Sequence, residues 1–212
     1  MPSIYSVKPL FQKSLRPLVR LLARIGVTAN QVTLLACALS ITTGILLIAF
    51  RGRPRLMLIL PLFFFLRMAM NAIDGMLARE FSQKSDLGAY LNELTDVVSD
   101  SFLYLPFAYL GVFEPLWIGI IIVLAVISEM AGAIGVMIGA TRHYDGPMGK
   151  SDRAFVFGAI ALWIGLGGTI VPLVAWALPG LLAILLVATI INRVRNGLTE
   201  KKTARASSMR AS

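Results

Sequence analysis

The chain is poor in charged residues and in cysteine. Only 15% of its 212 residues are charged, whereas 57% are hydrophobic. A soluble domain carries about 25% charged residues, so this composition excludes an ordinary soluble protein. The single cysteine, Cys37, excludes an intrachain disulfide. No apolar core directly follows the first charges of the N-terminal segment, so we expect no cleavable signal peptide.

Long apolar runs are what the sequence has instead. Several of them reach the roughly 20 residues that a helix needs to cross a bilayer. They predict an all-α integral membrane protein with six transmembrane helices, at about 28–50, 56–73, 88–109, 116–140, from 154 onward, and from 179 to 193. Pro179 is expected in the first turn of the sixth span, a position that tolerates proline.

The segment before these spans, residues 1–27, predicts an interfacial amphipathic helix. One face carries apolar residues and another carries bases: Leu15, Leu18, Leu22 and Ile25 against Lys13, Arg16, Arg20 and Arg24. Such a helix suits the lipid headgroup region, although a solvated basic arm is an alternative. Residues 28–195 then form one six-helix transmembrane domain, and the polar segment 196–212 is expected to be a disordered cytosolic tail.

The distribution of lysine and arginine predicts the orientation in the membrane. Bases gather in the N-terminal segment, in two alternate loops and in the tail, whereas the opposite side has Arg51, Arg53 and Arg55. Because cytosolic loops are rich in bases, both termini are expected in the cytosol. No eukaryotic targeting motif is visible. The bases follow this topology, and nothing in them indicates nucleic-acid binding.

One acidic stretch interrupts the apolar pattern: "NAIDGMLAREFSQKSDLGAYLNELTDVVSD", residues 71–100. On two helices joined by the turn "FSQKSD", helical spacing places three residues on one face and three on another: Asn71, Asp74 and Ala78, then Asn92, Asp96 and Asp100. Ser85 and Asp86 lie where the second helix needs an N-cap. If the two faces meet, their hard oxygen donors suit Mg²⁺ or Mn²⁺.

The spacing in this stretch resembles the signature of the CDP-alcohol phosphotransferases (CDP-alcohol phosphatidyltransferases), D-x₂-D-G-x₂-A-R-x₈-G-x₃-D-x₃-D. Six of its eight fixed positions match, with two asparagines at the others: Asn71, Asp74, Gly75, Ala78, Arg79, Gly88, Asn92 and Asp96. "TANQVT" at 28–33 is similar to the family's entry to its first span, and "GKSDR" at 149–153 to a cytosolic loop. The likeness covers most of the chain, from about residue 5 to 195. With the absence of a eukaryotic targeting motif, it implies a bacterial inner membrane as the location.

The resemblance implies a transferase of phospholipid synthesis that displaces CMP from a CDP-alcohol, with CDP-diacylglycerol the expected donor and a small alcohol the acceptor. It implies Asp96 as the general base, and Mg²⁺ or Mn²⁺ held by Asp74 and Asp96 with Asn71, Asn92 and Asp100. The nucleotide is expected against Asn30, Gly75, Ala78, Arg79 and Gly88. Lys150 and Arg153 are expected to hold a substrate phosphate. No motif identifies the acceptor.

Two departures from the signature weaken the expected metal site. Asn71 and Asn92 keep an oxygen donor but lose a negative charge each. Asp100, one turn beyond Asp96, is the expected compensating ligand. Glu93 is the poorer candidate, because it points about 100° away from its neighbour Asn92 around the helix. An active variant is favoured; a non-catalytic binder of CDP-lipid and a small secondary transporter with these charges as an ion path are the alternatives.

Arg67, His143 and a pair of glycines also need a partner or a role. Arg67 lies inside the second span, and an intramembrane arginine needs a counter-charge. We expect a structural ion pair with Glu129; contact with Asp74 or a phosphate is the alternative. His143 is expected to be a solvated loop residue. Gly135 and Gly139 form a GxxxG pair, which serves internal packing or the interface of a homodimer.

Overall fold

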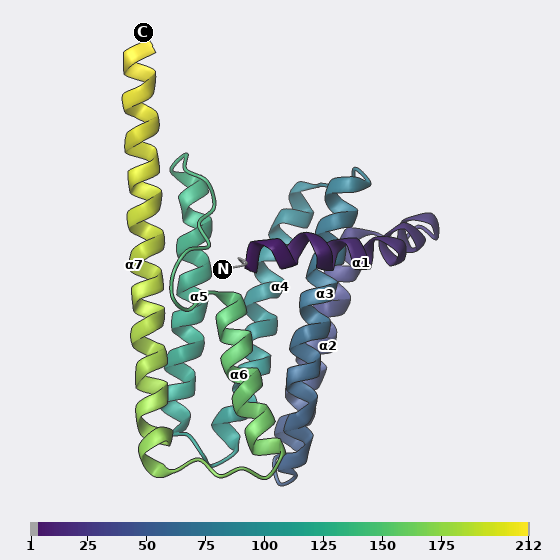
Figure 1. Ribbon diagram of the computed structural model, residues 1–212, viewed down its shortest axis with the longest axis vertical. Coiled ribbons are helices and arrows are strands. Elements are labelled where there is room, and N and C mark those ends of the chain that lie inside the picture. Colours follow the sequence, from purple (N-terminus) through teal and green to yellow (C-terminus); the bar gives the residue numbers. More distant parts are fainter. Residues whose placement is uncertain (1–3, 212) are drawn as a thin grey trace. The chain divides into compact units, whose positions relative to one another are not determined.

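The computed structural model describes the backbone of residues 4–211 and the side chains of residues 10–204, and within that range every regular element is a helix (Figure 1). The α-helices are α1 (Ile4–Arg24), α2 (Ala29–Ala49), α3 (Ile59–Glu80), α4 (Asp86–Tyr104), α5 (Pro115–Met137), α6 (Lys150–Gly165) and α7 (Pro172–Ala211). Two short 3₁₀ helices, η1 (Pro54–Leu58) and η2 (Leu105–Tyr109), precede α3 and follow α4. The all-α prediction is confirmed.

The chain divides into two compact units. Unit 1 comprises Met1–Ile45 and Leu62–Leu103, and therefore holds α1, most of α2 and α3, and α4. Unit 2 comprises Leu46–Pro61 and Tyr104–Ser212, and holds both 3₁₀ helices with α5, α6 and α7. The acidic stretch of the sequence analysis lies in unit 1, whereas Lys150 and Arg153 lie in unit 2.

Among the described residues, four helical segments are long and apolar enough to cross a membrane: Ala29–Ala49, Pro54–Glu80, Pro115–Met137 and Pro172–Ala204. The prediction of six spans is not confirmed. Helix α6 has 16 residues, short of the roughly 20 that a span requires. Helix α4 carries Glu93, Asp96 and Asp100 within its 19 residues, which lowers its mean hydropathy. The chain is a multi-pass membrane protein.

The last helix corrects two predictions. Helix α7 begins at Pro172 and runs for 40 residues, so Pro179 lies inside the helix and not in its first turn. Proline is tolerated there at the cost of one backbone hydrogen bond, and apolar helices accept it more readily than soluble ones. Residues 196–211 continue the same helix, so the disordered tail is wrong: extending an existing helix through Lys, Arg and Ala requires no new nucleation.

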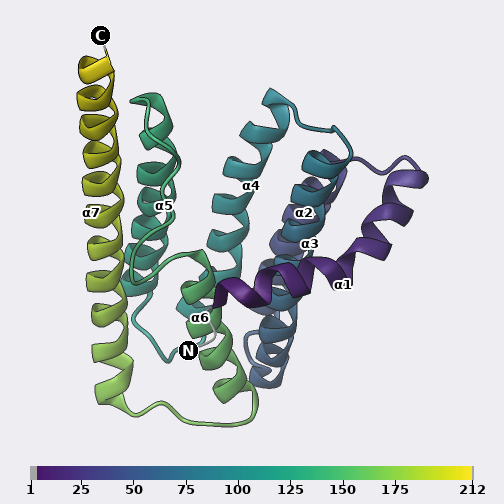
Figure 2. The same ribbon diagram turned by 45° about the horizontal axis from the view of Figure 1, so that its top comes forward.

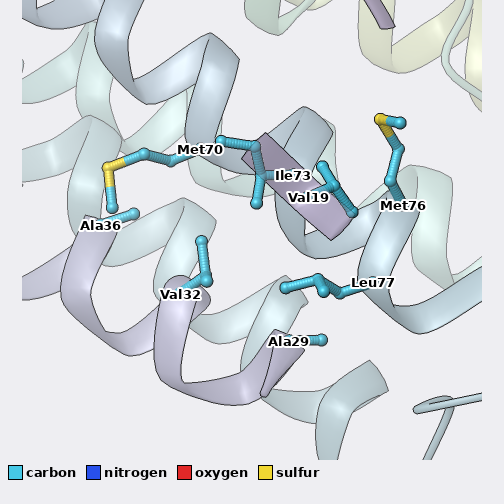
Figure 3. Packing of buried hydrophobic residues seen from close by; sticks show 8 residues of the cluster. All are labelled: Val19, Ala29, Val32, Ala36, Met70, Ile73, Met76 and Leu77. Carbon is cyan, nitrogen blue, oxygen red and sulfur yellow. The ribbon is translucent and has the colours of Figure 1, made fainter. Parts of the chain in front are cut away.

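The core of unit 1 forms where α1 lies across α2 and α3 (Figure 1). Val19 of α1 is fully buried, and Leu15 and Leu22 pack beside it. Figure 3 shows Val19 among side chains of α2 and α3: Ala29, Val32, Ala36, Met70, Ile73, Met76 and Leu77. Burying each large side chain contributes about 1.5–3 kcal/mol. This packing holds the N-terminus of α2 beside the C-terminal half of α3, where the acidic stretch begins.

A glycine brings α2 close to α4. A Cβ at Gly44 would collide with the backbone carbonyl of Phe102, so no larger residue fits between the two helices. Close approach through small residues is how membrane helices gain packing energy without a hydrophobic driving force. Helix α4 is thereby positioned against α2 in the same unit as α3.

In unit 2, α7 lies beside α5 (Figures 1 and 2). Gly132 and Gly135 of α5 contact the loop that follows this helix: a Cβ at Gly135 would come within 3.0 Å of the Thr141 carbonyl oxygen. Helix α5 ends at Met137, and Gly139 sits in a turn at φ +85°. The two glycines of the GxxxG pair therefore do not share a helical face, and that basis for a dimer interface is wrong. Internal packing at Gly135 is confirmed.

Candidate functional site

The turn between α3 and α4 is tied to the start of α2. Ser85 caps α4: the backbone N–H of Gly88 donates to its Oγ at 3.0 Å, which confirms the predicted N-cap. Gln83, in the same turn, accepts from the backbone N–H of Ala29 at 2.7 Å. This hydrogen bond satisfies one of the donors left open at the N-terminus of α2. The segment "TANQVT" and the acidic stretch therefore meet at one end of unit 1.

Asn30 and Gly88, both predicted to contact the nucleotide, lie against each other. A Cβ at Gly88 would come within 2.9 Å of Asn30 Oδ1 and 3.1 Å of Ser85 Oγ. Gly88 is half-buried, and the amide of Asn30 lies where a side chain at this position would be. These residues come from α2 and α4, and the fold of unit 1 brings them together.

Arg79 covers Gly75 on α3. A Cβ at Gly75 would lie 3.0 and 3.1 Å from the two terminal guanidinium nitrogens of Arg79. Arg79 itself is exposed, and Ala78 beside it is half-buried against the core of unit 1. An exposed guanidinium offers several N–H donors, which suit a phosphate. The predicted grouping of Gly75 with Arg79 is therefore present in the structure.

Asp74 is buried, with 6% of its surface exposed, and Thr33 of α2 supports it. Thr33 Oγ1 lies 2.8 Å from Asp74 Oδ2, and also 3.1 Å from the backbone oxygen of Ala29. The hydroxyl hydrogen bond fixes the orientation of the carboxylate on α3. Sequence reasoning missed this role of Thr33. The available signal was its place as the last residue of "TANQVT".

Arg67 links the two acids of α4. Its Nη2 lies 3.2 Å from Asp96 Oδ1 and 3.1 Å from the Asp96 backbone oxygen, and its Nη1 pairs with Asp100. The same Asp96 Oδ1 accepts from Asn71 Nδ2 at 3.4 Å. The sequence analysis expected Glu129, or Asp74 or a phosphate, as the partner of Arg67. The structure pairs Arg67 with Asp96 and Asp100, because residues 67 and 71 of α3 face the acidic face of α4, so the expected pair with Glu129 is wrong.

These contacts join the two halves of the signature. Asn71 comes from α3 and Asp96 from α4, 25 residues apart in sequence. Asn92 and Glu93 are half-buried on α4. The described residues contain no group of three or more His, Cys, Asp and Glu side chains placed to hold a metal. The three predicted carboxylate ligands, Asp74, Asp96 and Asp100, are therefore not placed together as such a group. Two carboxylates, of Asp74 and Asp96, with the amide oxygens of Asn71 and Asn92 are donors of the kind that a hard divalent cation takes.

Unit 2 holds a second buried charge cluster, centred on Glu129 of α5. Arg153 Nη2 lies 2.9 Å from Glu129 Oε1, and Arg142 and Arg193 lie 3.3 and 3.4 Å from Oε2. Burial lowers the pKa of the Arg142 guanidinium, and Tyr144 opposes that shift. The predicted phosphate ligand Arg153 is thus 1% exposed and bound to a carboxylate of the protein. Lys150, the first residue of α6, is half-buried.

His143 is not the solvated loop residue that the sequence analysis expected. Its Nδ1 lies 3.2 Å from Asp145 and its Nε2 lies 3.0 Å from Glu200 of α7. Thr141 also binds Glu200, with its backbone N–H 3.0 Å and its hydroxyl 2.9 Å from the carboxylate. The loop after α5 is therefore fastened to α7, and Glu200 gains partners by lying on a continuous helix.

Known proteins resemble this chain in sequence and in fold. Residues 26–199 match the sequence profile of the CDP-alcohol phosphatidyltransferase family. The chain is 46% identical over 199 residues to the inner membrane protein YnbA of Escherichia coli, covering 92% of this chain and 96% of YnbA. The crystal structure of Mycobacterium tuberculosis phosphatidylinositol phosphate synthase (PgsA1) with CDP-DAG bound superposes with a TM-score of 0.71 at 21% identity, covering 86% of this chain and 92% of that one. The same enzyme with manganese and citrate also gives 0.71, at 21% identity and with 86% and 88% covered.

Proposed function

Since this chain belongs to the CDP-alcohol phosphatidyltransferase family, we propose that it transfers a substituted phosphate from a CDP-alcohol to an alcohol acceptor and releases CMP. The observation that carries the proposal is the hydrogen bond between Asn71 and Asp96, which joins the two halves of the signature across α3 and α4. The donor we propose is CDP-diacylglycerol. In support, the crystal structure of PgsA1, which shares the fold at 21% identity, has CDP-DAG bound.

The residues of unit 1 divide the proposed work. Asp96 takes the proton of the acceptor hydroxyl as the new oxygen–phosphorus bond forms and the bond to CMP breaks. Asp74, held by Thr33, would bind a divalent ion together with Asp96 and the amide oxygens of Asn71 and Asn92. That ion, when bound, neutralises the diphosphate and makes CMP a better leaving group. Mg²⁺ and Mn²⁺ both suit these oxygen donors.

The remaining predicted contacts complete the substrate side of the proposal. We propose that the nucleotide lies against the half-buried backbone at Gly75 and Gly88, where Arg79 and Asn30 lie against the two glycines and Ala78 is one turn from Gly75. Lys150 is proposed to contact a substrate phosphate. Arg153 was predicted to do the same, but in the structure its guanidinium binds Glu129, so a phosphate there would have to share it.

We place the protein in a bacterial inner membrane with both termini in the cytosol. The name of the relative YnbA, an inner membrane protein, supports the location. The bias of lysine and arginine between alternate loops supports the orientation. Labelling of single cysteines introduced into the 51–55 turn and the 138–149 loop tests the orientation. A reagent that does not cross the inner membrane is expected to label the 51–55 turn and not the 138–149 loop.

A second function has a specific observation in its favour. Asp96 is ion-paired to Arg67, so one oxygen of its carboxylate already has a partner within the protein. A protein that binds CDP-lipid without turning it over would tolerate this pairing. The transferase remains the better-supported function because Asp74, Arg79 and Asp96 are all retained together.

Release of CMP separates the two functions. Purified protein in detergent, with CDP-diacylglycerol, Mn²⁺ or Mg²⁺ and a panel of alcohols, is expected to form CMP. Asp96→Asn is expected to reduce the rate by about 10²–10⁴-fold, the contribution of a general base. Asp86→Asn is the matched control, because it removes an exposed carboxylate from the same helix. Metal-dependent binding of CDP-lipid without CMP for any acceptor would support the non-catalytic binder instead.

A further inference from the structure

We propose that Arg67 is a fixed internal cation of the carboxylate site in unit 1: it positions Asp96, it takes Asp100 as its own partner, and it limits the site to one divalent ion. This inference rests on the proposed function for the identity of the site. It goes further by giving Arg67 a role, and by removing Asp100 from the metal ligands that the sequence predicted.

The location of Arg67 makes it part of the site. It lies on α3 one helical turn before Asn71, and 4% of its surface is exposed. Its two terminal nitrogens contact both Asp96 and Asp100, which lie one turn apart on α4. A buried guanidinium requires such partners, since an unpaired charge in a low-dielectric interior is very costly. The arginine is therefore held between α3 and the two acids Asp96 and Asp100 of α4.

The charges of the site balance with a single divalent ion. Three carboxylates, of Asp74, Asp96 and Asp100, and one guanidinium give a net charge of −2 on these side chains. A signature with four aspartates would carry −4. The asparagines at positions 71 and 92 remove two of these negative charges. The positive charge of Arg67 offsets a third, and the additional carboxylate of Asp100 restores it. A second divalent ion beside Asp96 would lie next to the guanidinium, and like charges at that distance repel strongly away from bulk water.

The same contacts position the proposed base. Asp96 Oδ1 is near both Arg67 at 3.2 Å and Asn71 at 3.4 Å, so two donors from α3 hold one oxygen of the carboxylate. Because a carboxylate is planar, fixing Oδ1 sets the direction in which Oδ2 points. Arg67 acts on the reaction through Asp96 and is a positioning residue.

Asp100 is explained by Arg67 and not by a metal. It is 4% exposed and pairs with Arg67 Nη1. A carboxylate engaged by a guanidinium gains little by exchanging that partner for a metal, because the exchange would leave the arginine with one acid fewer. Asp100 therefore offsets the cost of burying Arg67 beside Asp96.

Counting bound Mn²⁺ tests the proposal without requiring turnover. Full-length protein in lipid nanodiscs is titrated with Mn²⁺ and the free ion is measured by electron paramagnetic resonance. Wild type is expected to bind one Mn²⁺ per chain, and Arg67→Lys, which keeps the charge, is expected to bind one as well. Arg67→Gln is expected to bind a second Mn²⁺ or to bind the first about tenfold more tightly. Arg20→Gln, an exposed arginine of α1, is the matched control.

Asp100→Asn gives a second, independent measurement. If Asp100 serves Arg67, this variant keeps one Mn²⁺ with its Kd changed by less than about 5-fold, whereas loss of a direct ligand would raise the Kd by about 100-fold or more. Two Mn²⁺ in wild type, a folded Arg67→Gln with unchanged binding, or a 100-fold loss in Asp100→Asn would each overturn the proposal. If Arg67→Gln does not fold, the wild-type count and Asp100→Asn still decide.

The outcomes separate this inference from the proposed function. Release of CMP by a protein that binds two Mn²⁺ supports the transferase and overturns the role of Arg67. One Mn²⁺ in wild type and a second in Arg67→Gln, without CMP from any acceptor, supports the role of Arg67 and overturns the transferase. Wild type that binds no Mn²⁺ overturns both.

Discussion

The two units of this protein bury charge in opposite proportions. In unit 1, one arginine contacts two aspartates, whereas in unit 2 one glutamate contacts three arginines. The contacts are chemically alike, with guanidinium nitrogens on carboxylate oxygens. The net charge of the two clusters differs. The Arg67 cluster (Arg67, Asp96 and Asp100) has an excess of negative charge, which suits a cation, and the Glu129 cluster has an excess of positive charge. An ion pair therefore indicates a ligand only through the charge that remains after pairing.

The Glu129 cluster is expected to matter most for folding. Glu129→Gln would remove the one carboxylate shared by Arg142, Arg153 and Arg193 and is expected to lower the free energy of unfolding by about 3–5 kcal/mol. Unfolding in mixed micelles with increasing SDS measures the change. Glu114→Gln is the control, because that glutamate precedes α5 and is exposed. A loss below about 0.5 kcal/mol would show that the three arginines are held equally well by other partners.

The Arg67 cluster and its neighbour Asp74 are expected to matter more for binding than for folding. Thr33→Val keeps the shape of the side chain but removes the hydroxyl that orients Asp74. We expect the Kd for Mn²⁺ to rise by about 10–100-fold, as for other partners of metal ligands. Thr43→Val, on the same helix but not part of the site, is the control. An unchanged Kd would mean that Asp74 does not bind the ion.

The cap of α4 tests how firmly unit 1 holds the acidic helix. Ser85→Ala removes the acceptor of the Gly88 N–H and is expected to cost about 1 kcal/mol of stability. The SDS titration used for Glu129 measures it, and Ser82→Ala in the same turn serves as the comparison. If the two variants are equally stable, the Ser85 side chain does not stabilise the start of α4.

An exposed ion pair in unit 1 is expected to give the smallest effect. Arg16 of α1 and Glu80 of α3 lie 3.0 Å apart, but both side chains are more than a third exposed. Water and salt screen such pairs, so Glu80→Gln is expected to change stability by less than about 1 kcal/mol. A larger loss, measured at low and high salt, would show that the pair anchors α1 and would bring it closer to the buried clusters.

Much of the site was readable from the sequence because it is local. The spacing within 71–100 placed Asn71 and Asp74 on one helical face and Asp96 and Asp100 on another, and Ser85 was predicted as the cap that the structure shows. What failed was longer in range. Arg67 and Glu129 were each expected to need a partner, but hydropathy does not show which helices pack together. The sequence therefore could not show that Arg67 pairs with Asp96 and Asp100 and not with Glu129.

The end of the chain failed for a different reason. Residues 196–211 are polar, and polarity alone predicted disorder, yet they continue α7. Composition does not show that an existing helix can be extended at little cost in free energy. Glu200 also gains its contacts with Thr141 and His143 only when the loop after α5 is in place.

By itself, the sequence determined that this chain is a helical membrane protein whose acids fall on two helical faces, because burial of apolar runs and the 3.6-residue turn act within one segment. Tertiary structure alone decided which buried charges meet, that Thr33 supports Asp74, and that Arg67 lies between Asp96 and Asp100. A charge buried in a low-dielectric interior pairs with an opposite charge that helix packing places beside it. The residue spacing within one helix does not determine how that helix packs against another.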